Sequence, residues 1–77
     1  MSAEDHLITL ISRWLARHIG NEELRRGIAE NGTEGLAPGQ LEAIGELAER
    51  VEHAAPGERG ELEMIARETL QTLVFGA

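Results

Sequence analysis

The chain has 77 residues with 42% apolar and 27% charged side chains, which predicts a single ordered domain over residues 1–77. It contains no cysteine, and this excludes disulfides, thiolate metal sites and cysteine nucleophiles. Its net charge of −7, with the arginines spread along the chain, argues against binding to nucleic acid or to an anionic membrane.

The same composition predicts a cellular location. No stretch approaches the roughly 20 apolar residues that cross a bilayer, and the first residues are acidic where a signal peptide is basic. We therefore expect a cytoplasmic protein. Arginine is used throughout in place of lysine, a codon bias that favours a bacterial source with a GC-rich genome.

The first predicted helix covers residues 3–19. Ser2 and Asp5 resemble a weak capping box at its start, and Gly20 follows it as an expected left-handed cap. Within these bounds apolar residues recur every three or four positions. At about 100° per residue they occupy roughly half of the helix circumference, which is wider than the stripe of a surface helix.

The wide apolar face of this first helix indicates either a central helix or a contact with a partner. If the neighbouring helices cover only part of it, Leu10 and Trp14 remain for a second subunit. His18 projects into the same face, in the last predicted turn. It is either a structural histidine at the edge of the core or a pH-sensitive contact at an interface.

A short second helix is predicted over residues 22–31, and Asn21 before it is a favourable N-cap. Leu24 and Ile28 supply its core contacts, while Gly27 weakens it. The residues that follow are rich in glycine and small polar side chains, and they predict a flexible loop.

The third predicted helix covers residues 38–55, with Pro38 in its first turn. Small residues in its apolar seam permit another helix to approach closely. The opposite side is acidic, and it is either a solvated face that maintains solubility or a surface that occludes a basic site on a partner. This acidic side comprises Glu42, Glu46, Glu49 and Glu52.

The fourth predicted helix covers residues 57–75. Met64 and Phe75 are close to three full turns apart and share the face opposite its apolar stripe, with Arg67 nearby. An outward methionine and aromatic residue at this spacing indicate an interaction patch. The alternatives are that this helix packs on two sides, or that Phe75 folds over the end of the bundle.

The sequence holds no recognisable catalytic, metal-binding or phosphate-binding motif. There is no Cys, Lys or Tyr, the glycine spacing is not that of a P-loop, and no Gly-rich elbow surrounds Ser12. No Glu lies three residues before a His, as it does in di-iron bundles, and the Glu49–His53 pair falls on a solvated face. We therefore expect no enzyme, no cofactor, no metal and no small-molecule substrate.

Together these patterns predict an all-α fold, either a compact four-helix bundle or three long helices with one short bridging helix. We expect a non-catalytic protein-interaction module, an accessory subunit or self-assembling adaptor that binds a protein partner or further copies of itself. The alternative is an acidic inhibitor of the immunity or antitoxin kind, which would use the acidic side of the third helix. The side chains expected to contact a partner are Leu10, Trp14, His18, Met64, Arg67 and Phe75.

Overall fold

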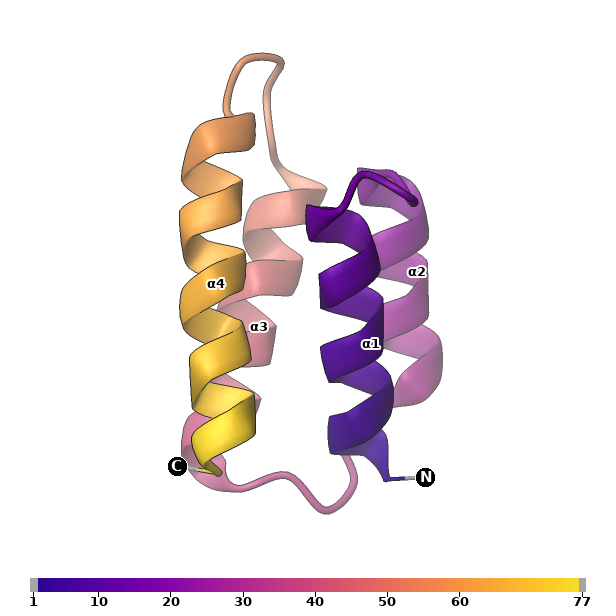
Figure 1. The fold of residues 1–77 in the computed structure, drawn as a ribbon, viewed down its shortest axis with the longest axis vertical. Coiled ribbons are helices and arrows are strands. Elements are labelled where there is room, and N and C mark those ends of the chain that lie inside the picture. Colours follow the sequence, from indigo (N-terminus) through magenta and orange to yellow (C-terminus); the bar gives the residue numbers. More distant parts are fainter. Residues whose placement is uncertain (1, 77) are drawn as a thin grey trace.

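The computed structural model describes residues 2–76, and within them the chain forms four α-helices and no strand. Successive helices run antiparallel, and the last returns alongside the first, so that each helix packs on two neighbours (Figure 1). The prediction of an all-α four-helix bundle is confirmed. The helices are α1 (Ala3–Leu15), α2 (Asn21–Asn31), α3 (Pro38–Glu52) and α4 (Arg59–Phe75).

Apolar side chains from the inner face of every helix build the core. They recur at the three- and four-residue spacing that places them on one side of a helix. Each large side chain removed from water contributes about 1.5–3 kcal/mol relative to exposure, so this set supplies most of the drive to fold. The buried apolar residues are Leu7, Ile11, Trp14, Leu24, Ile28, Ile44, Leu47, Val51, Leu62, Ala66 and Leu73.

The end of α1 differs from the prediction, because the helix stops four residues before the expected boundary. The His18 N–H donates to the Arg13 carbonyl at 2.9 Å, and the Arg17 N–H donates to the Trp14 carbonyl at 3.0 Å. Arg17 adopts a left-handed conformation with φ 65°. These features define a Schellman motif with arginine where glycine is usual. Gly20, expected in that role, has extended backbone instead and is the N-cap of α2.

The start of α2 also corrects a prediction. Asn21 is the first residue of the helix rather than its N-cap. Its Oδ1 accepts a hydrogen bond of 2.8 Å from the Nε1–H of Trp14. The side chain therefore satisfies the buried indole and does not cap the helix. Ile19, which the apolar pattern placed on α1, packs against the core from the connecting turn.

Polar side chains hold the opposite end of the bundle together. The Gln40 side chain is 2% exposed, and its Oε1 accepts from the Ala37 N–H at 2.8 Å. Its Nε2 donates at 3.0 Å both to Glu4 of α1 and to the Leu73 carbonyl of α4. A single amide therefore fixes the start of α3 against two other helices. Since the partners lie more than 30 positions away, no local pattern in the sequence indicated this role.

Candidate interaction surface

Trp14 is not available to a partner, and its assignment as a contact residue was wrong. The side chain is fully buried. The guanidinium of Arg59, in the first turn of α4, lies 3.9 Å from the centroid of the indole ring. The Arg59 Nη2 also donates to the Trp14 carbonyl at 2.7 Å. The wide apolar face of α1 is thus covered on this side by α4 of the same chain.

The structure moves His18 out of the apolar face of α1. The residue lies in the turn after α1 and is exposed, because the helix has already ended at Leu15. A helical projection carried to residue 19 therefore misplaced it. His18 is neither a buried histidine nor a member of an apolar contact surface, and its role toward a partner stays a prediction.

Leu10 is half-buried against α2 rather than free for a second subunit. A Cβ added to Gly27 would lie 2.6 Å from the Leu10 Cδ2, which is closer than real Cβ contacts come. The missing side chain at Gly27 is therefore what lets the two helices approach. Gly27 lowers the helix propensity of α2, but its lack of a side chain allows α1 to pack closely on α2. The expectation that Leu10 is free to contact a second subunit is therefore wrong.

The exposed apolar side chains lie mainly on α4. Met64 is 62% exposed and Phe75 is 78% exposed, so both point outward as the spacing predicted. Val74, which the sequence reasoning missed, is also 62% exposed. Several large apolar side chains exposed to solvent on one helix commonly mark a contact surface. Phe75 does not fold over the core, since most of its side chain is exposed.

Val74 and Phe75 form one wall of a shallow groove of about 310 Å³ between α1 and α4. We call it the α1–α4 groove. Ile8 of α1 lies on its other side, and Met64 is not part of its lining. None of the lining side chains is charged, in a chain with a net charge of −7. The groove is lined by Ile8, Ser12, Leu70, Gln71, Val74 and Phe75.

An arginine cluster surrounds Glu63 of α4, with guanidiniums from α4 and from the turn after α1. Glu63, with a side chain 19% exposed, accepts from the Arg59 Nε at 2.9 Å. Its two oxygens also lie 3.7 Å from Nη2 of Arg17 and of Arg67. The hydrogen bond from Arg59 is the main reason that the pKa of Glu63 is lowered. Arg67, expected at the interface, has a side chain 66% exposed and remains accessible.

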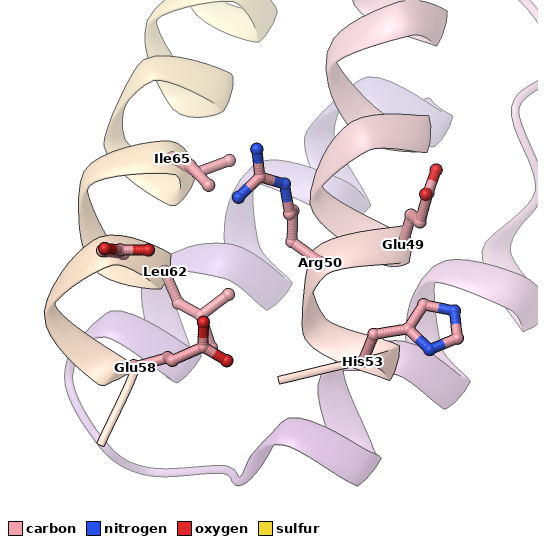
Figure 2. A pocket seen from close by; sticks show the side chains of 7 residues that line it. Glu49, Arg50, His53, Glu58, Leu62 and Ile65 are labelled. Carbon is pink, nitrogen blue, oxygen red and sulfur yellow. The ribbon is translucent and has the colours of Figure 1, made fainter. Parts of the chain in front are cut away.

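The acidic side chains of α3 are all exposed, as the pattern predicted. At the loop end of the α3–α4 pair, Figure 2 shows Arg50 between the two helices, with Leu62 and Ile65 on the α4 side and Glu49 and His53 on the α3 side. Within residues 2–76 no group of three or more His, Asp or Glu side chains is arranged to hold a metal ion. The space between these helix ends is a charged surface hollow lined by Glu49, Arg50, His53, Glu58, Glu61, Leu62 and Ile65.

Comparisons with known protein families, curated proteins and solved structures find no match to the chain. By its fold the chain belongs to the class of all-α helical bundles. Across residues 2–76 no helix is both long and apolar enough to span a bilayer.

Proposed function

We propose that this chain is a non-catalytic helical interaction module, an accessory subunit or self-assembling adaptor, and that it binds protein through the α1–α4 groove. The observation that carries the proposal is the exposure of Val74 and Phe75 beside an uncharged groove. Burying apolar surface contributes about 25 cal/mol per Å², so these side chains gain free energy when a partner covers them. Within the proposal the protein works in the cytoplasm, in line with its lack of cysteine.

The chemistry of the groove supports binding rather than catalysis. Its polar side chains are the hydroxyl of Ser12 and the amide of Gln71, and neither is paired there with an acid or a base. Proton transfer at neutral pH needs such a group within hydrogen-bond reach of the substrate. An apolar centre with a few neutral hydrogen-bonding groups is instead the usual composition of a protein interface.

The second candidate is an acidic inhibitor of the immunity or antitoxin kind. Glu42, Glu46, Glu49 and Glu52 are exposed along α3, which favours a partner with a basic site. Electrostatic steering would then dominate association, and the association rate would fall steeply as salt is raised. Binding through the α1–α4 groove would respond much less to salt.

Site-specific photo-cross-linking in the cells that produce the protein separates the two candidates. A photoreactive phenylalanine analogue replaces Phe75 in one variant and Glu46 in the other, since both positions are exposed. The proposal predicts a discrete product from position 75 that is lost when Val74→Asp is added. A product from position 46 alone would establish the acidic inhibitor instead, and no product from either position would contradict both functions.

A further inference from the structure

The negative charge of the chain is concentrated on one half of the bundle. Residues 18–58, which include α2 and α3, carry nine acidic and three basic side chains, a net charge of −6. Residues 2–17 and 59–76, which include α1 and α4, carry five acidic and four basic side chains, a net charge of −1. The exposed apolar groove therefore lies on the half of the molecule where a like-charged molecule meets the least repulsion.

The two ends of the groove carry opposite charge. Arg67 lies one turn before Leu70 on α4 and is one of the three guanidiniums that surround the Glu63 carboxylate. Asp5 lies one turn before Ile8 on α1 and is exposed. Because α1 and α4 run antiparallel (Figure 1), these two positions fall at opposite ends of the groove. The surface is thus apolar in the middle, positive at one end and negative at the other.

From this arrangement we infer that the occupant of the α1–α4 groove is a second copy of the chain, in a two-fold symmetric dimer; the inference rests on the proposed function. A two-fold axis lying across the groove exchanges its ends, so that Arg67 of each copy approaches Asp5 of the other. Such an interface is self-complementary, since one surface provides both halves of every contact. Val74 and Phe75 lie at the Asp5 end of the groove, because one Gln40 amide bonds both Glu4 and the Leu73 carbonyl. The exchange of ends therefore places them on the Ser12 and Leu70 end of the other copy, and the strongly acidic halves point away from the interface.

Charge reversals test the dimer and the pairing of its ends together. Asp5→Arg places a like charge opposite Arg67 twice in every dimer, and Arg67→Asp does the same opposite Asp5. Each single variant should dimerise at least tenfold more weakly than the wild type in sedimentation equilibrium, which corresponds to about 1.4 kcal/mol. In an equimolar mixture of the two variants every reversed side chain meets an opposite charge, so a heterodimer should form more tightly than either variant alone.

Two further variants serve as controls. Glu46→Arg makes the same change of charge as Asp5→Arg on an exposed helical position far from the groove, and it should leave dimerisation within about threefold of the wild type. Val74→Asp places a charge within the apolar part of the interface and should give a monomer. Circular dichroism establishes that each variant retains the helical fold, so that weaker association is not mistaken for unfolding.

The outcomes separate this inference from the function on which it rests. A wild-type chain that stays monomeric up to millimolar concentration, or a dimer equally sensitive to Glu46→Arg and Asp5→Arg, overturns the second copy as occupant. If the photoreactive side chain at position 75 then reacts with a different protein, the interaction module still stands. A monomer that also gives no product from position 75 overturns both.

Discussion

The Arg59 guanidinium stacks on the indole ring of Trp14 at 3.9 Å and donates a hydrogen bond to the main-chain carbonyl of the same residue at 2.7 Å. The indole N–H donates a hydrogen bond to the side chain of Asn21 at the start of α2. One buried tryptophan therefore ties α1, α2 and α4 together at the end of the bundle opposite Gln40.

Replacing Arg59 should destabilise the fold. Arg59→Ala removes the cation–π contact with Trp14 and two charged hydrogen bonds, one to the Trp14 carbonyl and one to Glu63. It should lower the free energy of unfolding by about 2 kcal/mol. Arg59→Lys keeps the charge but loses the planar fork, so the loss should be intermediate. Urea unfolding followed by circular dichroism measures both. Arg67→Ala is the matched control, because its 3.7 Å ion pair is largely exposed and should matter by less than about 0.5 kcal/mol. Equal losses at the two positions would contradict this account of Trp14.

The contact between Leu10 and Gly27 should give a measurable coupling. Gly27→Ala gains up to about 1 kcal/mol in helix propensity, but its new Cβ meets the Leu10 side chain, which must shift. In a Leu10→Ala background that obstruction is gone. We therefore expect Gly27→Ala to be more favourable by about 1 kcal/mol in that background than in the wild type. Thermal unfolding of the four proteins in this double-mutant cycle gives the value, and strict additivity would refute the close approach.

Arg17 holds a backbone conformation that costs an L-residue about 1 kcal/mol or more. Arg17→Gly should therefore raise the free energy of unfolding by about 1 kcal/mol, even though it removes the exposed ion pair with Glu63. Arg17→Ala removes the same ion pair but retains the strained backbone, so it should not stabilise. A stabilisation shared by both variants would show that the charge, and not the left-handed turn, decides the effect.

The ion pairs of Glu63 should make stability depend on pH in the acid range. The folded pKa of Glu63 lies below its ordinary value of 4.5, mainly through the Arg59 hydrogen bond. Its contribution to stability is complete above pH 4.5, where the carboxylate is charged in both folded and unfolded states. The contribution disappears as the pH falls through the folded pKa.

Comparing Glu63→Gln with the wild type isolates this contribution. The difference in unfolding free energy should be constant near neutral pH and shrink as the pH falls below 4.5. Glu46→Gln provides the reference, because the Glu46 carboxylate makes no ion pair with any residue from 2 to 76. A Glu63→Gln difference that grows on acidification would have the wrong sign for a lowered pKa.

The fold was predictable because it depends on local spacing. The three- and four-residue recurrence identified every helix, and the inward positions of α2 and α4 filled the core as that spacing indicates. The end of α1 was not predictable in this way. Ile19 continues the apolar pattern, yet a left-handed Arg17 ends the helix before it. Glycine is the usual residue in such a left-handed turn. The prediction therefore took Gly20 as the cap and placed the end of the helix at residue 19, beyond the true turn at Arg17.

The candidate surface was predictable only in part. Phe75 and Met64 were expected outside from their place on α4, and they are exposed. Trp14 is covered by Arg59, which lies 45 positions away in the sequence, so its burial could not be predicted from local spacing. The width of the apolar face on α1 indicated that part of it would lack a neighbour. It could not indicate which part, and the uncovered side is the one that carries Ile8.

Phe75 is the single phenylalanine in the chain, so a fluorinated analogue reports on the α1–α4 groove with one fluorine resonance. We predict that this resonance shifts as the protein is concentrated from micromolar to millimolar, reaches a plateau as the dimer fills, and stays at its dilute position in Val74→Asp. A resonance that keeps the same position at every concentration, and also after addition of extract from the producing cells, would contradict the claim that this groove is a contact surface.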